Sequence, residues 1–230
     1  MSPQPVTLKI LNIVSTILVV AAFVLVMLFT PMEKVMGLVQ KVFYFHVANA
    51  WVGMVGFIVA AVVAVIYLRT KDMKWDIIGL AAVEISLVFF LIAIVLGSIW
   101  ARPIWNAWWT WEPRLSTAAF LELFYAAYLL LRDGIDDPER RARFGAVYTL
   151  IGVIAVPITF FSIRMMRTIH PVVIGAGDSQ TSMGMTGEMY FAMFFSIIVF
   201  SIVFVTLFWH RIRLGQFASK VEQLKLKAAE

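Results

Sequence analysis

Residues 76–99 read DIIGLAAVEISLVFFLIAIVLGSI, and after the first position Glu84 is the only charged residue. An α-helix of about 20 apolar residues is long enough to cross the hydrocarbon core of a bilayer. Such a helix also satisfies its own backbone hydrogen bonds, which lipid cannot do. The stretch therefore predicts a transmembrane helix, and the rest of the chain has the same character.

The composition of the whole chain is that of a membrane protein. Hydrophobic residues make up 62% of its 230 residues and charged residues 14%, and the mean hydropathy is +0.90. Soluble proteins are roughly 45–50% apolar and about 25% charged, so a soluble enzyme is excluded. The chain has no cysteine, which excludes disulfides and thiolate metal sites. We predict an all-α membrane protein in which residues 1–230 form a single domain of six transmembrane helices, at about 8–30, 43–68, 76–99, 116–131, 144–163 and 189–209.

The distribution of Lys and Arg predicts the orientation in the membrane. Of the 19 cations, 13 lie in the N-terminal segment, the 69–76 and 132–143 loops and the C-terminal tail. Cytoplasmic loops carry the excess of Lys and Arg. Both termini are therefore predicted to be cytoplasmic, with the connections 31–42, 100–115 and 164–188 facing outward. We attribute the net charge of +5 to this topology and expect no nucleic-acid partner.

The second outer connection holds a cluster of tryptophans. Residues 100–116 read WARPIWNAWWTWEPRLS and contain five of the eight tryptophans of the chain: Trp100, Trp105, Trp108, Trp109 and Trp111. Interfacial aromatic belts flank both membrane surfaces, whereas this cluster belongs to one loop. Its indole rings offer a flat surface with Arg102 and Arg114 on the flanks, which favours a planar ligand that carries anionic groups.

Two of the three histidines are predicted to share the outer face with these tryptophans. His46 lies one turn inside the second helix and His170 lies in the last outer loop, whereas His210 is expected at the cytoplasmic membrane surface. Two neutral imidazoles can ligate an iron from opposite faces of a porphyrin. A zinc site is the weaker alternative, because the pattern offers no third ligand.

Several other residues within the helices carry predictions of their own. Glu84 and Glu122 lie at different depths, so each is expected to bond a neighbouring helix or to face a cavity. Pro157 is predicted to kink the fifth helix. Gly53 and Gly56 suit close helix packing.

The tryptophan segment, residues 100–116, resembles the WWD signature of haem-handling membrane proteins. The stretches His46-Val-Ala-Asn-Ala-Trp51 and Arg167-Thr-Ile-His170 are similar to the two outward histidine motifs of the CcmC family of cytochrome c maturation. The chain departs from the family pattern at two positions, because Glu112 replaces the aspartate of the signature and Ala48 replaces a usual proline.

The resemblance implies a protein of the cytoplasmic (inner) membrane that binds haem b on the periplasmic or exterior side and delivers it to the haem chaperone CcmE. It implies His46 and His170 as axial ligands of the iron and the five tryptophans as a platform. Glu112 is expected to orient the loop or the chaperone, and the charges of Arg102 and Arg114 suit contacts with the haem propionates. The implied partners are the single-helix protein CcmD and the ABC transporter CcmAB.

The sequence leaves other functions open. It contains no Gly-x-x-x-x-Gly-Lys-Ser/Thr motif, so we expect neither an ATPase nor an enzyme. The alternative from the enzyme class is a membrane haem oxidoreductase subunit that transfers electrons, which ordinarily needs paired histidines on both sides of the bilayer. A haem-conducting pore and a purely structural subunit rank below it.

Overall fold

The structure, a computed structural model, describes residues 3–34, 36–172 and 185–229. Part of the predicted outer connection 164–188 lies outside these residues. Within the described ranges, six helical segments are long and apolar enough to span a membrane. The prediction of an all-α protein with six membrane-spanning helices is therefore confirmed.

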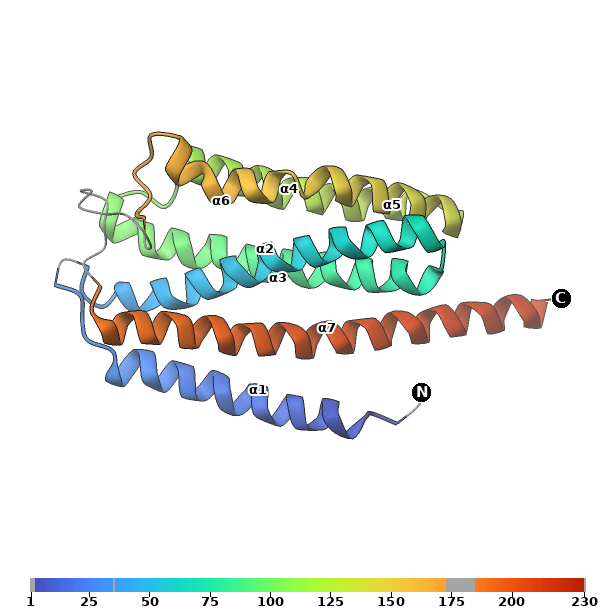
Figure 1. The fold of residues 1–230 in the computed structure, drawn as a ribbon, viewed down its shortest axis with the longest axis horizontal. Coiled ribbons are helices and arrows are strands. Elements are labelled where there is room, and N and C mark those ends of the chain that lie inside the picture. Colours follow the sequence, from blue (N-terminus) through green and yellow to red (C-terminus); the bar gives the residue numbers. More distant parts are fainter. Residues whose placement is uncertain (1–2, 35, 173–184, 230) are drawn as a thin grey trace.

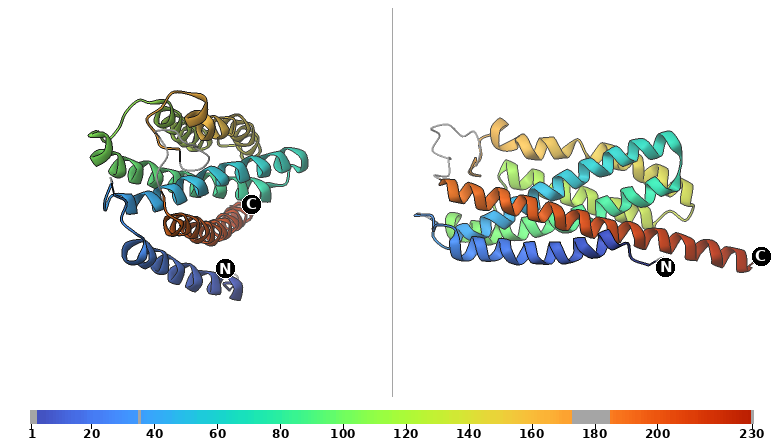
Figure 2. Two further views of the ribbon diagram at one scale, coloured as in Figure 1. Left: turned by 60° about the vertical axis from the view of Figure 1, so that its left-hand side comes forward. Right: turned by 60° about the horizontal axis from the view of Figure 1, so that its bottom comes forward.

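The helices form one bundle with their axes along its long dimension (Figures 1 and 2). In chain order they are α1 (Val6–Val24), its π-helical continuation η1 (Leu25–Phe29), α2 (Gln40–Thr70), α3 (Met73–Trp105), α4 (Pro113–Asp133), α5 (Pro138–Gly152), α6 (Ala155–Met165) and α7 (Gly187–Ala229). The chain reverses its direction between successive membrane-spanning segments, so both termini lie at one end of the bundle (Figure 1). The connection between α3 and α4 lies at the opposite end.

The tryptophan loop is shorter than predicted, because helix occupies both ends of the range 100–115. α3 continues through Pro103 to Trp105, since a proline in the last turn removes a single hydrogen bond. The helix ends where Asn106 adopts a left-handed conformation with φ 53°. α4 begins at Pro113, and the side chain of Glu112 caps it. Only residues 106–112 remain non-helical between the two helices.

Two other spans also differ from their predicted bounds. The fifth span is interrupted between α5 and α6, where Pro157 has no N–H for the carbonyl of Val153 and the N–H of Val156 donates to it instead, at 3.1 Å. The helix is therefore interrupted directly before Pro157. α7 does not end at residue 209 but continues to Ala229, because residues 210–229 contain no proline and are rich in Leu, Lys, Gln and Ala, which favour helix.

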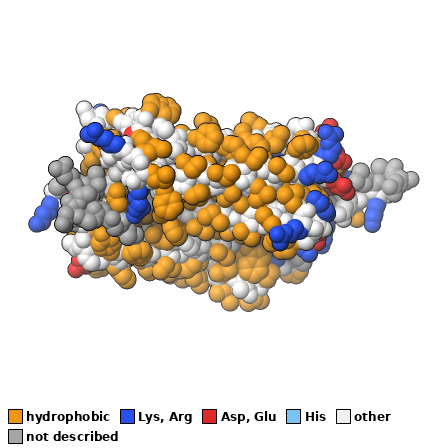
Figure 3. All heavy atoms as spheres, turned by 45° about the horizontal axis from the view of Figure 1, so that its top comes forward, with side chains coloured by type: hydrophobic (Ala, Val, Ile, Leu, Met, Phe, Trp, Pro, Cys, Tyr) orange, Lys and Arg blue, Asp and Glu red, His pale blue; other side chains and the backbone are white. Residues whose placement is uncertain are grey.

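The centre of the bundle is built on close contact between α2 and α3. A Cβ atom on Gly53 would lie 2.9 Å from the Cβ of Phe90, so the two backbones approach closely there. The rings of Phe57 and Tyr125 stack with centroids 4.0 Å apart and join α4 to this core. On the face shown in Figure 3, hydrophobic side chains cover the middle of the bundle and Lys and Arg gather towards its two ends, as a bilayer requires.

Charged and polar pairs join the helices near the end that carries the termini. The guanidinium of Arg132 in α4 donates two hydrogen bonds to the carboxylate of Asp76 in α3, with N···O distances of 2.6 and 2.8 Å. Arg211 of α7 donates to Glu84 of α3 at 2.8 Å, which confirms that Glu84 bonds a neighbouring helix. His210 contacts the side-chain oxygen of Asn12 at 2.8 Å.

Candidate functional site

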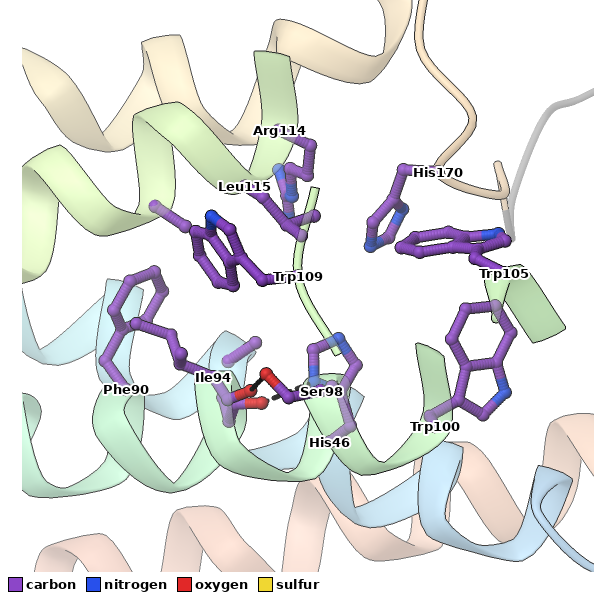
Figure 4. A pocket seen from close by; sticks show the side chains of 14 residues that line it. His46, Phe90, Ile94, Ser98, Trp100, Trp105, Trp109, Arg114, Leu115 and His170 are labelled. Carbon is purple, nitrogen blue, oxygen red and sulfur yellow. Dashed lines mark hydrogen bonds between the residues drawn. The ribbon is translucent and has the colours of Figure 1, made fainter. Parts of the chain in front are cut away.

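A pocket opens at the end of the bundle that carries the tryptophan segment. It lies between α2, α3, the start of α4 and the segment that follows α6 (Figure 4). Six of the residues proposed from the sequence line it: His46, Trp100, Trp105, Trp109, Arg114 and His170. Long-range packing thus brings together side chains from four separate parts of the chain.

His46 projects from the first turns of α2 against α3. Its Nδ1 lies 2.8 Å from the carbonyl oxygen of Ala93, which can only accept, so Nδ1 carries the proton and Nε2 keeps its lone pair. The imidazole occupies the space beside Gly97, where a Cβ atom would lie 2.8 Å from Cε1 of His46. α3 therefore holds this ring in a fixed orientation.

His170 lies in the non-helical segment after α6. Its Nδ1 lies 3.2 Å from the carbonyl oxygen of Pro171, which again leaves Nε2 without its proton. Burial, together with the nearby charges of Arg114 and His46, lowers the pKa of His170 to about 3. The ring is therefore neutral at physiological pH, which is the form that ligates metals.

The two imidazoles face each other across the pocket (Figure 4), with ring centroids 6.4 Å apart and planes at 42°. A ligating imidazole nitrogen lies about 2 Å from its metal, so two rings on opposite sides of one ion have centres roughly 6 Å apart. Hydrogen bonds from Nδ1 to carbonyls are the usual support of ligating histidines. The described part of the chain contains no group of three or more His, Cys, Asp or Glu side chains placed to bind a metal ion by themselves. The pair thus fits a metal whose other ligands come from a bound macrocycle.

The five tryptophans separate into two groups. Trp100, Trp105 and Trp109 line the pocket, and the ring of Trp105 lies 6.3 Å from that of His170. The buried indole N–H groups of Trp100 and Trp109 find no acceptor among the described residues. Trp108 and Trp111 are instead 59% and 78% exposed and do not line the pocket. Of the five tryptophans predicted to form one platform, the fold therefore places three in the pocket lining and two at the surface.

The two arginines that flank the tryptophan segment also occupy different environments. Arg114 lines the pocket, and its guanidinium donates to the carbonyl of Thr159. Within the described ranges it forms no ion pair with a carboxylate. Arg102 is exposed, donates to Asn106 at the end of its own helix and does not line the pocket. The fold thus places Arg114, but not Arg102, in the lining of the pocket.

A larger apolar cavity of about 340 Å³ adjoins the first pocket and shares His46, Arg114 and His170 with it. Residues of α2, α6 and α7 line it, and two of them, Trp51 and Phe194, are 44% and 48% exposed. Its wall includes Arg164 of α6, a residue to which the sequence assigned no role at the site. The position of Arg164 at the end of a predicted span, six residues before His170, could have indicated a role at the site.

Glu112 does not line either cavity. One carboxylate oxygen accepts the main-chain N–H of Leu115 at 2.7 Å, as the N-cap of α4. The other oxygen accepts the hydroxyl of Thr168, in the segment that carries His170. The structure therefore connects Glu112 to that segment, in keeping with the expectation that it orients a loop.

Comparison with known proteins identifies the family. Residues 4–227 match the CcmC family, described as Heme exporter protein C. The chain is 31% identical to Heme exporter protein C of Bradyrhizobium diazoefficiens, over 86% of this chain and 75% of that protein. It is 31% identical to Heme exporter protein C of Rhodobacter capsulatus, over 92% and 88%. A ccmC-like mitochondrial protein of Marchantia polymorpha, named for cytochrome c biosynthesis, is 29% identical over 61% of this chain. The chain therefore belongs to the CcmC family.

Proposed function

We propose that this chain binds haem b between His46 and His170 on the outer side of the cytoplasmic membrane and delivers it to the haem chaperone CcmE. Membership of the CcmC family gives the chain a role in haem export for cytochrome c maturation. Haem is the cargo of this reaction, and the chain acts as a binding and transfer protein. The family also supports a place in a haem exporter system, for which we propose CcmD and the transporter CcmAB as partners.

One observation carries the proposal. The imidazoles of His46 and His170 each donate a hydrogen bond from Nδ1 to a main-chain carbonyl. Their ring centroids lie 6.4 Å apart, where the aromatic pocket meets the apolar cavity. Each Nε2 has its lone pair available for one side of a haem iron. The iron would be held by protein on both axial positions.

The surrounding side chains suit the rest of the macrocycle. Trp105 and Trp109 offer ring surface for stacking. Arg114 and Arg164 border the apolar cavity and can pair with the two propionates. Because Trp51 and Phe194 of the cavity lining are exposed at the surface of the bundle, part of a bound haem would remain accessible to the chaperone that receives it. The exposed Trp108 and Trp111 are candidate contacts for that chaperone.

The experiment is an absorption spectrum of the purified protein with haem, in oxidised and reduced form, for the wild type and for His46→Ala, His170→Ala and His210→Ala. The wild type is expected to give a six-coordinate low-spin spectrum, which each of the first two substitutions abolishes. His210→Ala is the matched control, because His210 contacts Asn12 and does not line the pocket. Transfer from each loaded variant to CcmE is then measured.

Two results would contradict the proposal. An unchanged low-spin spectrum in both His46→Ala and His170→Ala would remove these residues as ligands. A haem that cycles reversibly between oxidised and reduced forms but is never released to CcmE would favour the oxidoreductase alternative.

A further inference from the structure

Thr168 connects the carboxylate of Glu112 with the backbone of His170. The Thr168 hydroxyl donates to Glu112 across a sequence separation of 56 residues. The same oxygen accepts the main-chain N–H of His170 at 3.0 Å. A short chain of side-chain hydrogen bonds thus joins the acidic end of the tryptophan segment to the second histidine.

We infer that Glu112 and Thr168 are positioning residues that hold His170 at its distance from His46. The inference rests on the proposed function in that His170 is taken as a haem ligand. Neither residue lines the pocket, so both act through His170 and neither touches the cargo.

The chemistry of the hydroxyl explains how the connection fixes the backbone. A threonine hydroxyl has one hydrogen. Because that hydrogen goes to Glu112, the lone pairs of the oxygen are turned away from the carboxylate, and one of them receives the N–H of His170. The bond to an ionised carboxylate is stronger than a neutral one, and linked hydrogen bonds polarise each other. The orientation of the residue 168–170 turn is therefore set by Glu112.

The segment has few other restraints. It follows the end of α6 at Met165, and after Met166, whose N–H still donates to the carbonyl of Ser162 at 3.0 Å, its described residues are not helical. Met166 and Ile169 are 48% and 51% exposed, so apolar burial contributes little on that side. Side-chain hydrogen bonds must therefore supply much of the order at His170.

The same carboxylate also fixes the start of α4, since its other oxygen caps the helix at Leu115. Arg114 projects into the pocket from this first turn. Glu112 thereby fixes the position of Arg114 relative to His170, although it lines neither cavity itself. This gives an acidic residue at the end of the tryptophan segment a physical role.

The test is Thr168→Val, which keeps the shape of the side chain, removes both hydrogen bonds and leaves the cap of α4 intact. Thr168→Ser restores the hydroxyl. Thr117→Val is the matched control, because the Thr117 hydroxyl bonds only to carbonyls at the start of α4. Two quantities are measured in detergent: the spin state and affinity of bound haem, and amide hydrogen exchange of residues 166–172 in the haem-free protein.

For Thr168→Val we expect faster exchange in residues 166–172, a partial change from low-spin to high-spin haem and roughly tenfold weaker binding. Thr168→Ser and Thr117→Val should match the wild type. If exchange and spectrum in Thr168→Val equal those of the wild type, the inference is overturned while the proposed function stands. If the wild type binds no low-spin haem, the proposed function fails, and exchange in the haem-free protein still decides whether Thr168 positions His170.

Discussion

Gly97 of α3 and His46 of α2 occupy complementary positions: a Cβ atom at Gly97 would lie 2.8 Å from Cε1 and 2.9 Å from Nδ1 of the imidazole. One helical turn earlier, the carbonyl of Ala93 binds the same Nδ1. α3 thus provides both a space for the ring and an acceptor that orients it. Because a contact below 3.0 Å forces atoms to shift, a side chain at Gly97 would displace either the imidazole of His46 or α3.

Gly97→Ala should therefore displace the His46 ring. We expect about tenfold weaker haem binding, in line with the cost of overpacking a filled site, together with loss of the low-spin spectrum. Gly79→Ala is the control on the same helix, because a Cβ there would meet only Val63 at an ordinary 3.5 Å. A haem titration of the two variants decides the matter. Equal affinities would show that the ring has room to adjust.

Trp109 and Trp111 should have separable functions, although they are two residues apart and their rings lie 5.6 Å from each other. Trp109 lines the pocket, so Trp109→Ala is expected to weaken haem binding roughly tenfold through lost stacking and burial. Trp111 is 78% exposed, so Trp111→Ala should leave haem affinity unchanged and reduce the rate of transfer to CcmE. Equilibrium binding and single-turnover transfer are measured on both. The separation fails if Trp111→Ala loses haem.

Arg114 should recognise the carboxylates of haem. Hydrogen bonds to charged groups contribute roughly 1.5–3 kcal/mol, so Arg114→Gln is expected to bind haem at least tenfold more weakly. The wild type should bind haem dimethyl ester, which has no free carboxylate, with similarly reduced affinity, and the ester should not distinguish wild type from variant. Arg102→Gln is the control, because Arg102 lines neither cavity and donates to Asn106. An equal loss for haem and ester in Arg114→Gln would assign Arg114 a purely structural role.

The Arg132–Asp76 pair should stabilise the end of the bundle that carries the termini. Their side chains are only 7% and 11% exposed, so Arg132→Met leaves a carboxylate buried without its partner. Removing one partner of a buried pair costs about 3–5 kcal/mol. The expected result is a clearly lower unfolding temperature in detergent. Lys74→Met removes a cation from an exposed pair and should change that temperature little. Similar unfolding temperatures for the two variants would contradict this role.

Much of the architecture could be read from local patterns. The run 76–99 predicts a membrane-spanning helix because the free energy of transferring each side chain from water into lipid depends mainly on the type of that residue. Pro157 predicts the interruption between α5 and α6 for an equally local reason, since its ring removes one donor. The histidines and tryptophans stood out by residue type, in a chain with only three His and eight Trp.

The sequence by itself thus determined the six membrane-spanning helices, the segment that holds the tryptophans and the choice of His46 and His170 as candidate ligands. Only the tertiary structure decided that the rings face each other at 6.4 Å, that Trp109 faces the pocket while Trp111 does not, and that Arg164 borders the cavity instead of Arg102. Hydropathy and helix propensity are sums over neighbouring residues. The direction of a side chain depends on the rotation of each helix, the position of its caps and the contacts that distant segments make with it.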